Sequence, residues 1–219
     1  MPMSVPVAKR SRRPADRVLD VAEDLFHTQG VDATGVDAIV AQSGVSKSTL
    51  YRHFPSKADL VAAYLRRGHE RRLGEWVAEI RDRDVPPAQR ILDLFDWLGD
   101  WFATPAFGGC RFINAAVQLR DPTHPAFAIP GEHKEEVRRL LADAAAQAGA
   151  IASDELAAEL SLLIDGAVIR ALLERDSSAA QRARRLAVLT LADHGVTVQP
   201  AARSRGRGRR AAAPARRAA

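Results

Sequence analysis

Apolar residues recur every three or four positions along most of this 219-residue chain, which is the spacing of one face of an α-helix. The first such stripe runs over residues 16–29, with Val18, Ala22 and Leu25 on one face. Gly30 follows it, as is common at a helix C-terminus. No segment alternates apolar and polar residues with the period of two that marks a strand. The pattern predicts an all-α fold of about nine helices.

Two short helices are predicted after the first one, joined by a tight turn at Gly44, which permits a left-handed backbone that a side chain would resist. Thr34 is expected to cap the first of them, with Asp37 in the capping-box position. Ser46 is expected to cap the second, and Ser56 the long helix that follows. These signals predict a three-helix unit leading into a longer helix.

Helical periodicity continues to about residue 194. A long helix is expected from Lys57, although Gly68 and Gly74 weaken the expectation that it is unbroken. Ser153 is expected to cap a helix that is apolar on much of its circumference. The other helical segments are predicted near residues 87–102, 110–117, 131–148, 153–174 and 178–194.

Charge is distributed unevenly, although the net charge is only +5. Residues 196–219 contain seven arginines and no acidic residue, whereas residues 58–195 are mildly acidic. This arginine-rich tail has too little apolar surface to offset the entropy of ordering, so we expect it to be disordered. Residues 1–14 are expected to form a flexible basic arm. A basic end beside an acidic body indicates that one part of the chain binds a polyanion.

The single cysteine, Cys110, excludes an intramolecular disulfide framework and fits a reducing cytoplasm. No secretory signal and no apolar stretch of about 20 residues is found, so we expect a cytoplasmic protein without a membrane partner. The six histidines show no metal-ligand spacing, and no nucleophile motif is present. We therefore expect neither a metal site, nor a cofactor, nor an enzyme.

The second short helix carries an unusual set of polar, cationic and aromatic side chains. Lysine can donate to guanine acceptors, and serine and threonine can serve either kind of base edge. Exposed helix N-termini attract phosphate oxygens, and basic arms of other helix-turn-helix proteins enter a minor groove. On these grounds the expected DNA contacts are Thr34, Ser46, Lys47, Ser48, Thr49, Tyr51, Arg52, His53, Lys57, Arg12 and Arg13.

Residues 16–64, and above all Gly44-Val-Ser-Lys-Ser-Thr-Leu-Tyr-Arg-His-Phe-Pro-Ser-Lys57, resemble the DNA-binding domain of the TetR family of transcriptional regulators. The resemblance includes the spacing of three helices, the glycine turn and the capped fourth helix. It implies a helix-turn-helix domain over 15–62 and a ligand-binding and dimerisation domain over 63–195. It also implies a homodimer that binds a palindromic operator in double-stranded DNA, usually as a repressor, and leaves it when a small-molecule effector binds.

The segments 109–114 and 121–125 resemble, more loosely, the regulatory domain of one TetR subgroup. This resemblance implies that the last two helices pair with their symmetry mates in a four-helix bundle. Their apolar faces suit a two-fold interface between identical subunits. The residues expected at the interface are Leu156, Leu160, Leu163, Ala167, Leu186 and Leu189.

The middle helices hold most of the aromatic residues, as apolar ligand sites often do. The expected effector contacts are Trp76, Trp97, Trp101, Phe107, Cys110 and Asn114. Each aromatic residue is also compatible with simple core packing. Cys110 is compatible with a small buried apolar residue or with a thiol sensor.

Two other functions remain open from the sequence. One is a redox-switched regulator acting through Cys110. The other is a general DNA-binding protein that uses the arginine-rich tail for contacts without sequence preference.

Overall fold

A computed structural model describes residues 13–198 of the chain. Within that range it contains nine α-helices and no strand, which confirms the predicted all-α class. The helices are α1 (Pro14–Gln29), α2 (Val36–Ser43), α3 (Lys47–His53), α4 (Lys57–Ile80), α5 (Pro87–Phe102), α6 (Arg111–Gln118), α7 (Ile129–Gln147), α8 (Ser153–Glu174) and α9 (Ser178–Asp193). None of these helices is long and apolar enough to cross a membrane.

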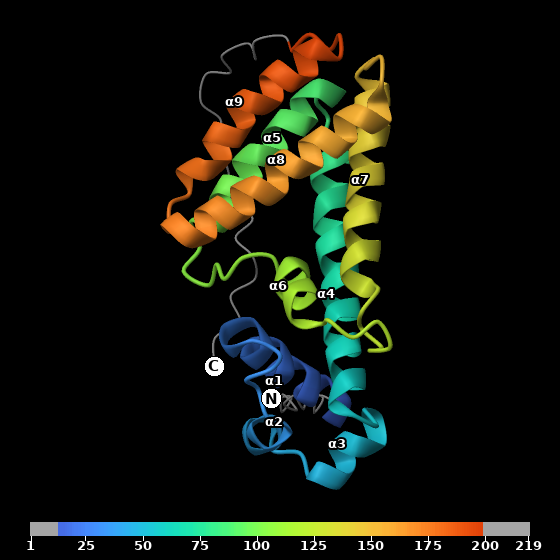
Figure 1. Ribbon diagram of the computed structural model, residues 1–219, viewed down its shortest axis with the longest axis vertical. Coiled ribbons are helices and arrows are strands. Elements are labelled where there is room, and N and C mark those ends of the chain that lie inside the picture. Colours follow the sequence, from blue (N-terminus) through green and yellow to red (C-terminus); the bar gives the residue numbers. More distant parts are fainter. Residues whose placement is uncertain (1–12, 199–219) are drawn as a thin grey trace, which may run out of the picture.

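The helices form two regions joined by α4 (Figure 1). The short helices α1, α2 and α3 lie at one end of the molecule, and α4 extends from them into the other region. There α4 packs along α7, α7 packs on α8, and α5 and α8 pack on α9. The short helix α6 lies between the two regions and also contacts α7.

Each region has its own apolar core. The first contains Leu25, Ile39 and Leu50 from α1, α2 and α3, but also Phe112 of α6. The second is built from α4, α5, α7, α8 and α9 around residues such as Phe95. Because α4 is continuous across residues 62 and 63, and α6 packs into the first core, the two regions are tightly connected.

Two of the four predicted N-caps are present. The hydroxyl of Ser46 accepts from the backbone N–H of Thr49, and the hydroxyl of Ser56 accepts from that of Asp59. Gly44 has φ 62° and ψ 28°, which is the predicted left-handed turn. The short helices are therefore fixed by local backbone chemistry as the sequence indicated.

Two predicted caps are wrong. Gly35, not Thr34, precedes α2, and the buried hydroxyl of Thr34 instead donates to the carbonyl of Gly30 at 2.7 Å. Ala152, not Ser153, is the N-cap of α8, and no side chain caps that helix. In each case the residue lies one position away from the one where a side chain can reach the free N–H groups.

The predicted ends of the folded region also shift. Pro14 is the first residue of α1, where its missing N–H costs nothing, so the arm ends earlier than predicted. At the other end, Val196 is buried and its N–H donates to the carbonyl of Leu191, so the folded chain extends past the predicted start of the tail. Most of the predicted arm, 1–12, and most of the predicted tail, 199–219, lie outside the described residues.

Candidate nucleic-acid interface and effector region

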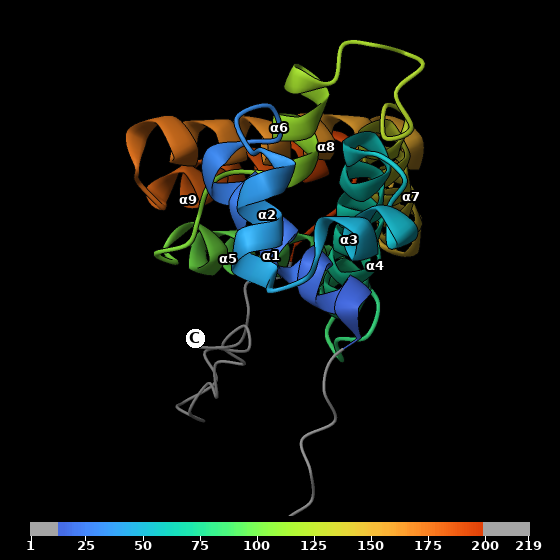
Figure 2. The same cartoon turned by 90° about the horizontal axis from the view of Figure 1, so that it is seen from below.

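The α3 helix is held rigidly at the end of the molecule. Its Leu50 is fully buried in the first core, while the opposite side of the helix faces outward. Figure 2, which views the molecule from this end, shows α2 and α3 in front of the other helices. A helix fixed in this way can present its outer side chains without rearrangement.

The structure brings most of the predicted DNA contacts together on this surface. Thr49 and Lys57 are half-buried, and Tyr51 is 39% exposed. Lys57 Nζ donates to the carbonyl of Asp32 at 3.4 Å. The exposed members of the predicted set are Ser46, Lys47, Ser48, Tyr51, Arg52 and His53.

Lys47 has a partner that the sequence interpretation did not anticipate. Its Nζ donates to Oδ1 of Asp37 at 2.8 Å, and this hydrogen bond raises the pKa of Lys47. Asp37 was expected only as part of a cap. The ion pair joins α2 to α3 in water, so its contribution to stability is small. It keeps the ammonium extended over the surface of the short helices.

One other predicted DNA contact, Thr34, does not lie on this surface, and another, Arg12, lies outside the described residues. Thr34 is fully buried, so its side chain cannot reach a phosphate and the prediction is wrong for this residue. Arg13 is exposed and directly precedes α1. Arg12 lies outside the described residues.

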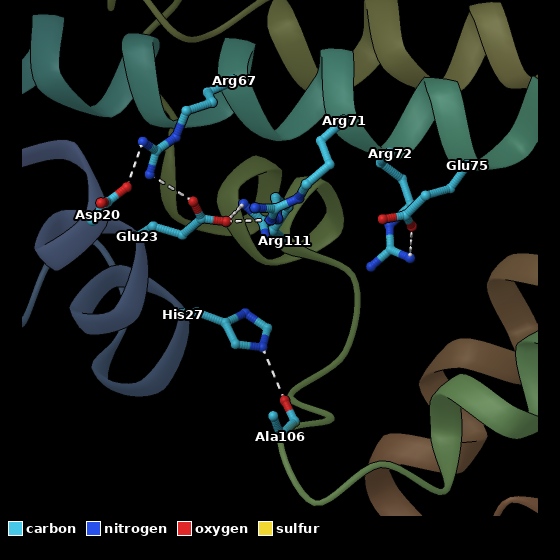
Figure 3. Close-up of polar contacts among 9 residues, drawn as sticks. All are labelled: Asp20, Glu23, His27, Arg67, Arg71, Arg72, Glu75, Ala106 and Arg111. Carbon is cyan, nitrogen blue, oxygen red and sulfur yellow. Dashed lines mark hydrogen bonds and ion pairs between the residues drawn. The ribbon is translucent and has the colours of Figure 1, made fainter. Parts of the chain in front are cut away.

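A cluster of charged side chains connects α1, α4 and α6, and we call it the Glu23 cluster (Figure 3). Glu23 accepts from Arg67 at 2.8 Å, from Arg111 at 2.7 Å and from Arg71. Arg67 also donates to Asp20 at 2.8 Å. Burial raises the pKa of Glu23, but the charge of Arg111 and hydrogen bonds from Arg71 and Arg111 outweigh this and lower the pKa to about 2. Glu23 is therefore a nearly buried carboxylate that pairs with three guanidinium groups at once.

Further contacts attach the α6 segment to the first region. Oε1 of Gln118 accepts from the backbone N–H groups of Val31 at 2.9 Å and Asp32 at 3.2 Å. His27 Nε2 lies 3.2 Å from the carbonyl of Ala106 (Figure 3). Together with the Glu23 cluster, these contacts tie the position of α6 to that of α1.

The predicted aromatic residues gather between α4 and α5. The ring centroids of Trp76 and Trp97 are 5.8 Å apart, and those of Trp101 and Phe107 are 5.0 Å apart. Trp97 and Trp101 stack at 6.5 Å. Trp76 is buried, whereas the other three are half-buried and keep part of their surface open. The four rings thus form one continuous group.

The two predicted polar contacts, Cys110 and Asn114, lie at the start of α6, in the segment that follows Phe107. Asn114 Nδ2 donates to the carbonyl of Gly108 at 3.0 Å, and so fixes the loop before α6. Cys110 directly precedes α6, is half-buried and packs against both cores. Asn114 therefore fixes the loop before α6 by a hydrogen bond, and Cys110 does so by packing.

Arg72 is a member of this region that the sequence interpretation missed. Its guanidinium carbon lies 4.6 Å from the ring centroid of Trp101 and 5.6 Å from that of Trp97. Its Nη1 donates to Oε2 of Glu75 at 2.6 Å. Burial lowers the pKa of Arg72, and the charge of Arg111 lowers it further. A guanidinium over two aromatic faces is a favourable cation–π arrangement.

A pair of histidines joins α4 to α7 beside α6. His69 Nδ1 and His133 Nδ1 are 3.0 Å apart, and the ring of Phe112 stacks on His133 at 3.7 Å. His69 Nε2 also lies 3.5 Å from Oε2 of Glu136. His133 is buried, and burial with the nearby charges of Lys134 and His69 lowers its pKa to about 3. The folded protein therefore holds His133 in its neutral form.

This histidine predicts a pH dependence of stability. The unfolded chain takes up a proton on His133 below its ordinary value of 6.5, whereas the folded chain does so only near 3. Stability is therefore lost as the pH falls from about 6.5 toward 3. We expect His133→Gln to lose a few kcal/mol less stability than the wild type between pH 6.5 and pH 3, as measured by urea unfolding. The exposed His53→Gln is the control, and an unchanged slope in His133→Gln would contradict the prediction.

The α8 and α9 surface differs from the predicted interface. Leu156, Leu160 and Ala167 are buried in the second core of their own chain, so they cannot lie between subunits as predicted. Leu163 is half-buried, whereas the predicted Leu186 and Leu189 are 50% and 66% exposed.

The exposed leucines of α8 are instead Leu162 and Leu173, with exposed fractions of 74% and 70%. Leu162 is two residues beyond Leu160, which is a rotation of about 200° around the helix. The apolar face that remains open therefore lies opposite the predicted one.

Two family models match most of the helical region. The model "Bacterial regulatory proteins, tetR family" matches residues 18–64, and the model "Tetracyclin repressor-like, C-terminal domain" matches residues 87–187. The chain belongs to the TetR family. The first match covers α2 and α3 together with most of α1, and the second covers α5 through most of α9.

Individual relatives support the same family assignment. The chain is 43% identical over 115 residues to an HTH-type transcriptional regulator of Mycobacterium tuberculosis, an alignment covering 47% of this chain and 56% of that relative. It thus spans about half the length of this relative. It is 30% identical over 146 residues to the HTH-type transcriptional repressor ComR of Escherichia coli, covering 63% of this chain and 69% of ComR. Both relatives are named as HTH-type transcription factors.

Solved structures show the same fold. A TetR-type transcriptional regulator from Streptomyces avermitilis is 30% identical with a TM-score of 0.75, covering 85% of this chain and 100% of that one. A TetR-family transcriptional regulator from Streptomyces coelicolor is 27% identical with a TM-score of 0.76, covering 83% and 96%. These similarities confirm the predicted fold and the family resemblance seen in the sequence.

Proposed function

We propose that this protein is a ligand-responsive DNA-binding transcriptional regulator, most simply a repressor that acts on cytoplasmic DNA. It binds a palindromic operator as a homodimer and leaves it when a small molecule binds the second region. The outward face of α3, held on a capped three-helix unit that matches the TetR family model, is the observation that carries this proposal.

The dimensions of α3 suit the major groove. It has seven residues, so it is roughly 10 Å long and fits a groove about 12 Å wide. Lys47 and Ser48 lie at its N-terminal end, where recognition helices contact base edges. Arg52 and His53, in its last turn, are positioned for phosphate contacts.

The exposed apolar face of α8 and α9 supports a homodimer. Leu162, Leu173, Leu186 and Leu189 are all at least half exposed and lie on helices that pack together. Large exposed apolar patches mark association sites. A two-fold dimer through this face would present two copies of α3 to two half-sites.

The alternatives draw no support from the family matches. Cys110 is half-buried at the start of α6, which fits a packing role as well as a thiol role. The arginine-rich tail lies mainly outside the described residues. The main proposal therefore stands on α3 and on the family.

The proposal is tested at α3. A duplex selected from a random DNA library by the wild-type chain serves as operator, and Lys47→Ala and Tyr51→Ala are each expected to weaken binding about 5- to 150-fold, as for lost base contacts. Gel shift at fixed salt measures the effect. Arg139→Ala is the matched control because Arg139 is an exposed cation that also pairs with a carboxylate, Glu135, on α7. Sequence-specific binding that survives in both α3 variants would show that another element reads the DNA.

A further inference from the structure

Arg72 is a half-buried arginine with few hydrogen-bond partners. It extends from α4 next to Glu75 (Figure 3), and its guanidinium lies over two rings of α5. Its one hydrogen-bonded partner among the described residues is Glu75, which is on the same helix, three residues away. A guanidinium carries five N–H donors. Apart from the bond to Glu75, the N–H donors of Arg72 donate to no described residue.

The surroundings of Arg72 carry surplus positive charge. The ion pairs of this region join four guanidinium groups to three carboxylates in the described part of the chain, those of Asp20, Glu23 and Glu75. Three of the four guanidinium groups share Glu23. The charges of Arg111 and Arg71 act on Arg72 as like charges. One added monoanion would balance the group.

The apolar half of a site lies directly against this charge. The guanidinium of Arg72 lies over Trp97 and Trp101, and Phe107 meets Trp101 edge to face. These three rings are half-buried, so each keeps part of its surface exposed to a ligand. The Arg72 side chain is 23% exposed, so its free donors can still be reached.

We propose that the effector of this regulator is an aromatic carboxylate, with its carboxylate on Arg72 and its ring against Trp97, Trp101 and Phe107. The inference rests on the proposed function and names its effector class. A carboxylate suits Arg72 because the guanidinium fork pairs with carboxylates through parallel hydrogen bonds. In the structure it already donates one hydrogen bond to a carboxylate, from Nη1 to Oε2 of Glu75 at 2.6 Å. A single negative charge also matches the local surplus.

The test uses isothermal titration calorimetry on the full chain with 2-naphthoate and its neutral analogue 2-naphthamide. The wild type is expected to bind the acid at least about tenfold more tightly than the amide, because only the acid forms charge-assisted hydrogen bonds. Arg72→Met is expected to abolish this preference, and Arg72→Lys to retain part of it. Arg66→Met, which removes an exposed cation from the same helix, is the control and is expected to retain it.

Glu75→Gln separates a ligand site from a purely structural contact. It removes the negative charge nearest the proposed carboxylate, so 2-naphthoate should bind several-fold more tightly than to the wild type. Equal binding of acid and amide by the wild type, no binding of either, or an unchanged preference in Arg72→Met would overturn the proposal. Operator binding by the wild type, measured in parallel, shows whether the proposed function survives such a result.

Discussion

Replacing both Leu162 and Leu189 with glutamate is expected to convert the proposed dimer to a monomer and to weaken operator binding by at least about 100-fold. Both side chains are mostly exposed in the single chain, with exposed fractions of 74% and 66%, so the fold of each subunit should tolerate the change. In a dimer through α8 and α9, four carboxylates would be buried without partners, which costs several kcal/mol. A monomer then loses the advantage of binding two half-sites at once.

Analytical ultracentrifugation measures the mass, and gel shift with the selected operator measures affinity. Val117→Glu is the matched control because Val117 is also 66% exposed but lies on α6. It should leave the dimer intact. Leu160→Glu separates the two assignments of the interface, since Leu160 is fully buried and its variant should unfold rather than dissociate. A folded Leu162→Glu, Leu189→Glu protein that stays dimeric would move the interface to another surface.

Local signals in the sequence were sufficient for the helices and for α3. Gly44, Ser46 and Ser56 each act within a few residues of themselves, so their types predict the turn and both caps. The exact N-cap position is harder to predict, because a serine or threonine one residue away from the N-cap gives the same signal in the sequence. Thr34 and Ser153 were misassigned for that reason.

The faces of α8 could not be predicted in the same way. Leucine, isoleucine, valine and alanine occur around most of its circumference, so periodicity does not reveal which stripe enters the subunit core. The buried stripe through Leu156 and Leu160 became clear only when α5, α7 and α9 were placed around it. The open stripe through Leu162 and Leu173 follows by exclusion.

The proposed effector region was also predicted only in part. The aromatic residues were predicted as a group because they are few and concentrated in one part of the chain. The four of them do meet in space. Arg72 was missed because arginines are common and its role depends on Trp97 and Trp101, about 25 to 29 positions away. Such long-range pairing carries no local signal.

The Glu23 cluster is the most extreme case, since it joins residues up to 88 positions apart. Arg111 reaches it by crossing α4 at Gly68, where a Cβ would lie 2.8 Å from the Arg111 side chain. This close contact explains why a glycine occupies this position inside α4, since any side chain there would clash with Arg111. The sequence showed Gly68 only as a weak point of the helix.

Replacing Glu23 with glutamine is expected to lower the free energy of unfolding by about 3 kcal/mol at neutral pH. The side chain is only 12% exposed and accepts from three arginines, and breaking a buried ion pair on one side leaves the other charges without compensation. The same magnitude follows from its pKa, which falls from 4.5 to about 2 on folding, at about 1.4 kcal/mol per unit. Urea unfolding followed by circular dichroism measures the change.

The pH dependence provides the sharper test of this cluster. Because folding lowers the pKa of Glu23, its stabilising effect is fully present above pH 4.5 and is lost as the pH falls toward 2. The stability difference between the wild type and Glu23→Gln should therefore shrink over that interval. Glu135→Gln is the control, since Glu135 also pairs with two arginines but is exposed to water, and its variant should unfold near the wild-type midpoint. A stability difference between the wild type and Glu23→Gln that stays constant from pH 5 to pH 2 would mean that the charge of Glu23 does not hold α1, α4 and α6 together.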